Sequence, residues 1–136
     1  MLTVLIADDE KPARDKLAHQ LSHCEGFTLI AQATNGEQAI EKINSLKPEL
    51  VLLDVEMPNL NGLDVLDVLT VPCSVIFTTA YNQYAVKAFE RAAVDYLLKP
   101  FSLARLKMAL ARVKMASQPP RDTATFTKQA AQFKSW

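Results

Sequence analysis

Short apolar runs recur along the chain, and between them hydrophobic residues return every three or four positions. The apolar runs predict five β-strands, and those with little alternation are typical of strands that are buried on both faces. Their expected ranges are residues 3–7, 27–33, 50–54, 74–77 and 95–98. In the second run apolar and polar residues alternate, which indicates one less protected face, so we expect this strand at an edge of the sheet.

The stretches between the strands have the periodicity of amphipathic helices. Pro12 suits the first turn of the first helix, and Ser102 is a good N-cap for the last helix. The apolar residues expected on the buried helix faces are Ala13, Leu17 and Leu21; Ala39, Ile40, Ile43 and Leu46; Leu63, Leu66 and Leu69; Ala85, Phe89 and Ala92; and Leu103, Leu106, Leu110 and Val113. Five strands that alternate with five helices predict an α/β fold with a doubly wound parallel sheet, because parallel strands are joined by right-handed crossovers.

The length of 136 residues fits one domain with a single sizeable core and is too short for two. The helical pattern ends near residue 116, so we expect one domain over residues 1–116. From residue 117 to residue 136 the pattern dissolves around Pro119-Pro120, and Thr, Gln, Lys and Ser are frequent. We interpret residues 117–136 as a linker or tail that leads to an output domain absent from this sequence.

The charges of the chain argue against two classes of partner. Fifteen Lys and Arg residues balance fifteen Asp and Glu residues. Contacts to nucleic-acid phosphates need clustered positive charge, so we expect no direct nucleic-acid binding by these residues. The first residues lack the basic region of a signal peptide, and no apolar stretch approaches 18 residues. We therefore expect a cytoplasmic protein with no membrane partner.

Polar residues that could bind a ligand or take part in a reaction lie at the ends of four of the predicted strands. Asp8 and Asp9 follow the first, Asp54 ends the third, Thr79 follows the fourth and Lys99 follows the fifth. The carboxyl ends of parallel strands meet at one edge of the sheet, where ligands bind in folds of this class. Carboxylates that lie 4 Å apart repel by roughly 4 kcal/mol per pair at an effective dielectric near 20, so three together call for a cation.

Mg²⁺ is the cation that such a group favours, because it takes oxygen ligands from one or two carboxylates and shares its other positions with water and phosphate. A lysine ammonium and a threonine hydroxyl both suit phosphoryl oxygens. The arrangement therefore predicts that Asp54 accepts a phosphoryl group. Taken alone, each residue has a plainer interpretation: the aspartates as helix caps, Thr79 as a turn residue and Lys99 as a surface lysine.

The motifs Asp8-Asp9-Glu10, Asp54 with Met57-Pro58 and Gly62, Thr79-Ala80 and Lys99-Pro100-Phe101 resemble the receiver domain of two-component response regulators over residues 2–115. The resemblance implies the flavodoxin-like strand order 2-1-3-4-5 and a cis bond between Lys99 and Pro100. It implies that Asp54 is the phosphoacceptor and that Thr79 and Lys99 hold the phosphoryl oxygens. It also implies that Asp9, Asp54 and the backbone carbonyl of Glu56 bind Mg²⁺ directly, with Asp8 binding through water.

Residues 78–89 and 95–101 look like the receivers that precede LytTR-type DNA-binding domains. This likeness implies a cognate histidine kinase as phosphoryl donor and an output that controls transcription. A stand-alone receiver that acts through protein contacts is an open alternative. A phosphatase with an aspartyl-phosphate intermediate would need its nucleophile on the first strand. A flavodoxin-like FMN binder would need a loop of backbone donors where Asp8-Asp9-Glu10 stands.

We expect phosphorylation to draw Thr79 toward the phosphate and to let Tyr96 turn inward, as the family resemblance implies. The fourth helix carries Tyr84, Lys87 and Arg91 on a flank beside its apolar stripe. That flank, with the fifth strand and the last helix, is the predicted partner surface. A homodimer formed there on phosphorylation is our hypothesis for the output.

Overall fold

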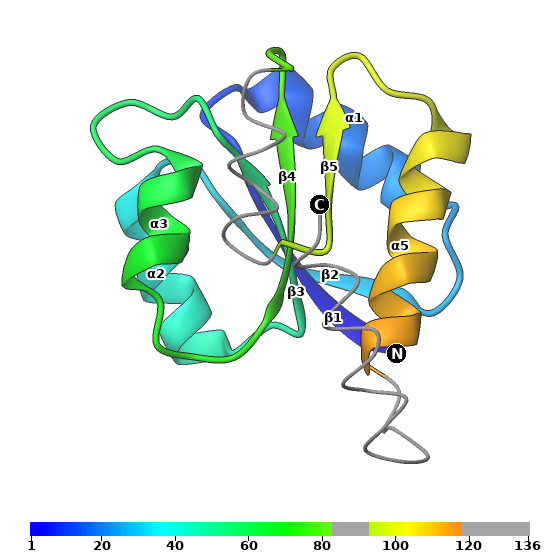
Figure 1. The fold of residues 1–136 in the computed structure, drawn as a ribbon, viewed down its shortest axis with the longest axis horizontal. Coiled ribbons are helices and arrows are strands. Elements are labelled where there is room, and N and C mark those ends of the chain that lie inside the picture. Colours follow the sequence, from blue (N-terminus) through cyan, green and yellow to red (C-terminus); the bar gives the residue numbers. More distant parts are fainter. Residues whose placement is uncertain (83–92, 118–136) are drawn as a thin grey trace.

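The computed structural model describes residues 1–82 and 93–117, which form a five-stranded sheet with helices on both faces (Figure 1). The elements are β1 Leu2–Ala7, α1 Lys11–Leu21, β2 Phe27–Ala33, α2 Gly36–Leu46, β3 Leu50–Asp54, α3 Gly62–Val68, β4 Ser74–Thr79, β5 Asp95–Leu98 and α5 Leu103–Ser117. The expected helix with Ala85, Phe89 and Ala92 lies outside the described residues. None of the described helices is long and apolar enough to cross a membrane.

The strand order is β2-β1-β3-β4-β5, and every neighbouring pair is parallel. The prediction of a doubly wound, flavodoxin-like sheet in the order 2-1-3-4-5 is therefore confirmed. β3 lies in the middle, so all five of its residues are buried, as an unbroken apolar run predicts. The order also brings the C-terminal ends of β1, β3 and β4 side by side, which is the arrangement that a shared site requires.

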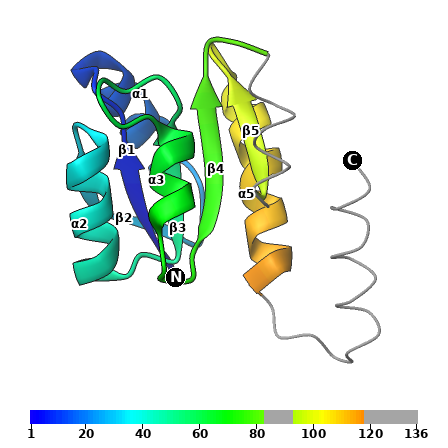
Figure 2. The same ribbon diagram turned by 60° about the vertical axis from the view of Figure 1, so that its left-hand side comes forward.

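The sheet lies between helices on its two faces (Figure 2), and each face forms an apolar layer with its helices. α2 and α3 pack on one face, where Ile43 and Val65 meet Val51 and Phe77. α1 and α5 pack on the other face. Buried residues in this second layer include Leu17, Leu21, Leu106, Ala109, Leu110, Val113, Val4, Ile6, Leu52 and Leu97. The strands β1, β3 and β4 thus send alternate side chains into different layers, which is why their sequences are apolar at nearly every position.

β2 is an edge strand, as its alternating pattern predicted, but its alternating apolar side chains change from one face of the sheet to the other along the strand. Phe27 and Leu29 pack in the layer of α1 and α5, whereas Ala31 and Ala33 pack in the layer of α2 and α3. The register between β1 and β2 shifts by one residue, because Val4 pairs with Leu29 while its neighbour pairs with Ala31. Such a bulge moves every later side chain to the other face of the sheet.

Local signals at the helix ends match the sequence. Asn35 accepts a hydrogen bond from the backbone N–H of Gln38, and Asn61 forms a capping box with Asp64. The hydroxyl of Ser102 accepts a hydrogen bond from the backbone N–H of Arg105, so the predicted N-cap is confirmed. The Lys99–Pro100 bond is cis, as the resemblance implied.

Some predicted boundaries and burials are wrong by small amounts. Leu46 was expected on the buried face of α2, but it is 48% exposed. It is the last residue of α2, next to the C-cap Lys47, whose φ of 50° ends the helix. β4 runs through Thr79 rather than stopping at residue 77, and α3 ends before Leu69, which is its C-cap. Leu103 is only half-buried in the first turn of α5.

Candidate functional site

Strand ends bring the predicted polar residues to one edge of the sheet. Asp8 and Asp9 follow β1, Asp54 is the last residue of β3, Thr79 is the last residue of β4 and Lys99 follows β5. Three of these side chains are almost completely buried, namely those of Asp8, Asp54 and Thr79. Asp9 is exposed. The edge of the sheet thus carries two buried carboxylates, those of Asp8 and Asp54, and one that is exposed to solvent, that of Asp9.

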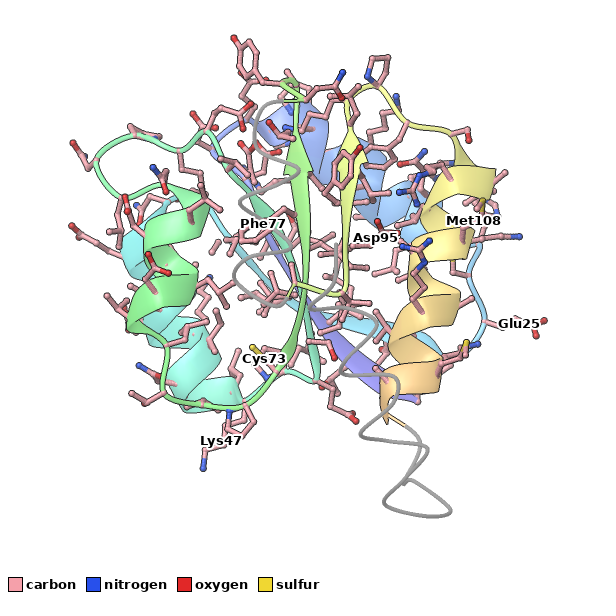
Figure 3. The ribbon with its side chains drawn as sticks, viewed as in Figure 1. Glu25, Lys47, Cys73, Phe77, Asp95 and Met108 are labelled. Carbon is pink, nitrogen blue, oxygen red and sulfur yellow. The ribbon has the colours of Figure 1, made fainter. Side chains whose placement is uncertain are left out.

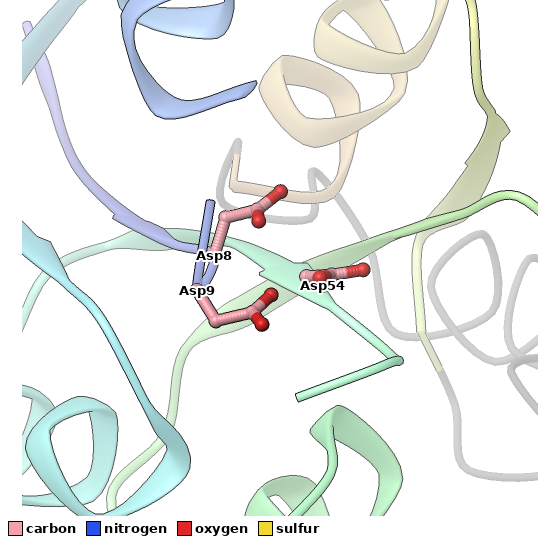
Figure 4. A group of neighbouring side chains, drawn as sticks. All are labelled: Asp8, Asp9 and Asp54. Atoms are coloured by element: carbon pink, nitrogen blue, oxygen red, sulfur yellow. The ribbon is translucent and has the colours of Figure 1, made fainter. Parts of the chain in front are cut away.

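The three aspartates form a cluster of oxygen donors (Figure 4). One carboxylate oxygen each from Asp8, Asp9 and Asp54 lies within 4.8 Å of the others. Oxygen donors without sulfur or imidazole are the set that hard divalent cations such as Mg²⁺ prefer. The residues present therefore fit a site for such a cation.

Lys99 is the ammonium group that the site places among these carboxylates. Its Nζ atom lies 2.8 Å from Oδ2 of Asp8 and 3.5 Å from Oδ1 of Asp54. Burial alone lowers the pKa of Lys99, but the hydrogen bond to Asp8 and the charges of both aspartates outweigh burial and raise it. Lys99 therefore stays protonated at neutral pH and holds the two buried carboxylates together.

Asp54 is short of positive charge even with Lys99 beside it. Burial raises the pKa of Asp54 to about 7, and the negative charge of Asp8 adds to this effect while Lys99 opposes it. A further cation in contact with a carboxylate of such a high pKa would stabilise its ionised form. The electrostatics of the site thus agree with the donor set in favouring a bound divalent cation.

The backbone around the aspartates is held by short contacts. Oδ1 of Asp8 accepts a hydrogen bond of 2.9 Å from the backbone N–H of Glu10, and Arg14 donates one of 2.9 Å to the backbone carbonyl of Asp8. The N-cap of α1 is Glu10, which makes no side-chain cap bond, so Asp8 and Asp9 do not act as its caps. A Cβ atom at Gly62 would lie 2.4 Å from the carbonyl oxygen of Asp54, so only glycine fits this close approach.

Thr79 has a partner that the sequence did not predict. Its hydroxyl donates a hydrogen bond of 2.8 Å to Oε1 of Glu56, and the backbone N–H of Ala80 donates one of 3.0 Å to the same oxygen. Only the backbone carbonyl of Glu56 was assigned a role from the sequence. The sequence shows an acidic residue two positions after Asp54, but it does not identify Thr79 as the partner of that side chain.

Of the predicted output residues, the structure describes Tyr96 but not those on the fourth helix. Tyr96 is half-buried on β5 and pairs with Phe77 of β4 in the sheet, while the described residues do not include Tyr84, Lys87 and Arg91. The preceding residue, Asp95, begins β5 and is 1% exposed, on the side of the strand that faces α5 (Figure 3). It accepts two hydrogen bonds of 3.0 Å from the guanidinium of Arg105, a structural pair that sequence periodicity did not reveal.

Curated relatives match most of this chain but only about half of their own length. A response regulatory protein of Vibrio cholerae is 45% identical over 116 residues, which are 83% of this chain and 48% of the relative. The positive alginate biosynthesis regulatory protein of Pseudomonas aeruginosa is 44% identical over 135 residues, 96% of this chain and 53% of the relative. The sensory transduction protein LytT of Bacillus subtilis is 42% identical over 121 residues, 87% and 50%. These last two relatives are regulators of the LytTR type, which confirms the predicted resemblance to that subgroup.

Solved structures and a family model agree with these relatives. The response regulatory domain of protein mrkE from Klebsiella pneumoniae has a TM-score of 0.77 and 25% identity, covering 85% of this chain and 97% of that one. A CheX–CheY–BeF₃–Mg complex from Borrelia burgdorferi has a TM-score of 0.76 and 26% identity, covering 83% and 89%. The sequence-family model described as response regulator receiver domain matches residues 4–111. This match favours a receiver domain over the phosphatase and the FMN binder that the sequence left open. The chain belongs to the response regulator receiver domain family of two-component systems.

Proposed function

We propose that Asp54 accepts a phosphoryl group from a cognate histidine kinase and that Mg²⁺ is required for the transfer. One observation carries this proposal: the carboxylates of Asp8, Asp9 and Asp54 lie within 4.8 Å of one another, with the ammonium of Lys99 3.5 Å from Asp54. Phosphoryl transfer needs a nucleophile, a cation and a further positive charge at the same place. This corner of the sheet offers the nucleophile and the charge, and it has the donor set for the cation.

Asp54 would act as the nucleophile. A carboxylate oxygen of Asp54 forms a bond to phosphorus while the bond from phosphorus to the donor breaks, and the leaving group keeps the electron pair. Only the ionised carboxylate attacks, and the pKa near 7 makes the ionised form scarce below neutral pH. Mg²⁺, when bound, would supply charge that favours ionisation and balances the phosphoryl oxygens.

The residues that would hold the ion are the carboxylates of Asp9 and Asp54 and the backbone carbonyl of Glu56, with Asp8 acting through water. The three carboxylates are those of the acidic cluster. The solved CheX–CheY complex contains Mg²⁺ together with BeF₃, a mimic of a phosphoryl group, which supports the same pairing in this chain.

The output would follow from new contacts to the phosphoryl group. Thr79 and Lys99 would each contribute about 1.5–3 kcal/mol through charge-assisted hydrogen bonds. A shift from 1:99 to 99:1 between two conformations needs about 5.5 kcal/mol, so these two contacts, which together contribute about 3–6 kcal/mol, are just large enough to switch the domain near the upper end of that range. Movement of Thr79 would leave room for Tyr96, which is half-buried and pairs with Phe77, two residues before Thr79 on β4.

The proposed destination of the signal is the surface of the fourth helix, β5 and α5. Tyr84, Lys87 and Arg91 are its candidate contact residues, and a homodimer on phosphorylation is the candidate assembly. The names of the relatives LytT and positive alginate biosynthesis regulatory protein support a role in controlling transcription, through a LytTR-type DNA-binding domain beyond this chain. Action through protein contacts alone is the alternative.

Incubation with acetyl phosphate tests the proposed reaction. With Mg²⁺ present, intact-mass spectrometry is expected to show one added phosphoryl group, and a chelator is expected to prevent the addition. The physical reason is that transfer needs the cation at the acidic cluster. An unchanged mass at millimolar acetyl phosphate and Mg²⁺ would rule the proposal out.

Mg²⁺ is also expected to stabilise the unphosphorylated protein. An ion that binds only the folded state raises the free energy of unfolding by about 2.7 kcal/mol at one hundred times its Kd. Asp9→Ala should erase the increase in melting temperature, because Asp9 is one of the three clustered carboxylates. Asp15→Ala is a matched control, since Asp15 is exposed and pairs with Lys11 on α1. Equal shifts in wild type and Asp9→Ala would remove Asp9 from the proposed ion site.

A further inference from the structure

The carboxylate of Glu56 occupies two hydrogen-bond donors at the end of β4. Oε1 lies 2.8 Å from the hydroxyl oxygen of Thr79 and 3.0 Å from the backbone nitrogen of Ala80. Thr78 pairs with Asp54 in the sheet, so these donors come from the two residues that follow the partner of Asp54. We propose that Glu56 is an internal competitor, which holds Thr79 and Ala80 in the unphosphorylated protein and must release them before they can bind a phosphoryl group on Asp54.

The competition follows from the number of available protons. A threonine hydroxyl has one hydrogen to donate, and a backbone amide also has one. The 2.8 Å contact of Thr79 with Glu56 is much shorter than its 3.4 Å contact with the carbonyl of Tyr81, so the hydroxyl proton is directed at Glu56. Both donors are therefore in use, and a carboxylate is a strong acceptor that resembles a phosphoryl group in charge.

The position of Glu56 couples this contact to Asp54. The backbone N–H of Glu56 lies 3.3 Å from Oδ1 of Asp54, while its side chain reaches across to β4. The charge of Glu56 is also one of the causes that raise the pKa of Asp54. A phosphoryl group adds nearly two negative charges at Asp54, so it repels the Glu56 carboxylate and attracts the two donors at once.

The hydrogen bonds of Glu56 to Thr79 and Ala80 are offset by a cost at its other carboxylate oxygen. The second carboxylate oxygen of Glu56, Oε2, is buried and has no hydrogen-bond partner among the described residues. A buried charged oxygen without a partner costs free energy, which offsets part of what the two hydrogen bonds contribute. Glu56 thus sets a threshold: it opposes the phosphorylated arrangement without preventing it.

Two variants separate the reach of Glu56 from its charge. Glu56→Asp keeps the charge but shortens the side chain by about 1.5 Å, which takes the carboxylate out of hydrogen-bond range of Thr79. Glu56→Gln keeps the length and removes the charge. This inference rests on the proposed function, so the test uses beryllofluoride, a mimic of the phosphoryl group on Asp54. Its affinity is measured at saturating Mg²⁺, so that differences in Mg²⁺ affinity between the variants do not affect the result.

Glu56→Asp is expected to bind beryllofluoride about tenfold more tightly than wild type, a change equal to about 1.4 kcal/mol. Glu56→Gln should also bind more tightly, because a neutral acceptor competes less well. In a Thr79→Val background the gain from Glu56→Asp should be much smaller, since the contested hydroxyl is gone. Binding by Glu56→Asp that equals or falls below that of wild type would overturn the inference.

A second measurement needs no ligand. The amide proton of Ala80 should move upfield in the NMR spectrum of Glu56→Asp, because its hydrogen bond to the carboxylate is lost, and it should stay near its wild-type position in Glu56→Gln. An unchanged Ala80 amide in Glu56→Asp would contradict the contact itself. If wild type and all variants fail to bind beryllofluoride, the proposed role of Asp54 is wrong; if all bind equally, only the competition by Glu56 is wrong.

Discussion

Asp54→Asn is expected to abolish phosphorylation by acetyl phosphate. The amide oxygen of asparagine is a poor nucleophile and forms no acyl phosphate, so removal of the carboxylate removes the reaction itself. Asn is nearly isosteric with Asp, and the buried end of β3 should keep its geometry. Intact-mass spectrometry of both proteins under identical conditions measures the effect.

A matched control guards against labelling at other carboxylates. Asp15 is exposed on α1 and lies outside the acidic cluster, so Asp15→Asn should be labelled as fully as wild type. Full labelling of Asp54→Asn would show that the phosphoryl group goes elsewhere. Loss of labelling in Asp15→Asn would point to a general defect of the variants.

The same substitution is expected to stabilise the protein when Mg²⁺ is absent. The pKa of Asp54 is raised from 3.8 to about 7, first by burial and then by Asp8. The folded state therefore binds more protons than the unfolded state between about pH 4 and pH 7, and stability falls as the pH rises through that window. Asp54→Asn has no such loss, so at pH 8 it should exceed wild type by about 2–4 kcal/mol.

Urea unfolding at pH 4.5 and pH 8, with a chelator, measures this difference. The gap between Asp54→Asn and wild type should be small at pH 4.5, where Asp54 is largely protonated in the folded protein, and large at pH 8. Mg²⁺ should narrow this difference in stability at pH 8, because it neutralises the ionised Asp54 carboxylate and so stabilises the wild-type protein. The Asp54→Asn variant has no such carboxylate to neutralise. A gap that does not depend on pH would mean that ionised Asp54 does not strain the folded state.

The strands and most of the site could be predicted from the residues, whereas the strand order came from the family resemblance. Apolar runs mark the strands, and in a parallel sheet the residues that follow them must meet at one edge. Asp8, Asp54 and Lys99 met these conditions, and the structure brings them within hydrogen-bonding or ion-pairing distance. Burial of Asp8 and Asp54 follows from the same position, since β1 and β3 lie inside the sheet.

What could not be predicted depends on single side chains and local irregularities. The bulge that divides Leu29 from Ala31 leaves no mark in a pattern of alternating residues. The exposure of Leu46 depends on where α2 ends relative to its neighbours, which periodicity does not specify. The contact from Glu56 to Thr79 joins a loop to a strand 23 residues away, and the sequence offered no reason to choose Thr79 over solvent.

The most direct test of the central claim is to locate the phosphoryl group. Borohydride reduces an aspartyl phosphate to homoserine, and peptide mass spectrometry then identifies the altered residue. After treatment with acetyl phosphate and Mg²⁺, the account predicts homoserine at position 54, in the peptide that contains the end of β3. Homoserine at Asp8, Asp9 or any other aspartate, with Asp54 unchanged, would contradict the assignment of Asp54 as the phosphoacceptor.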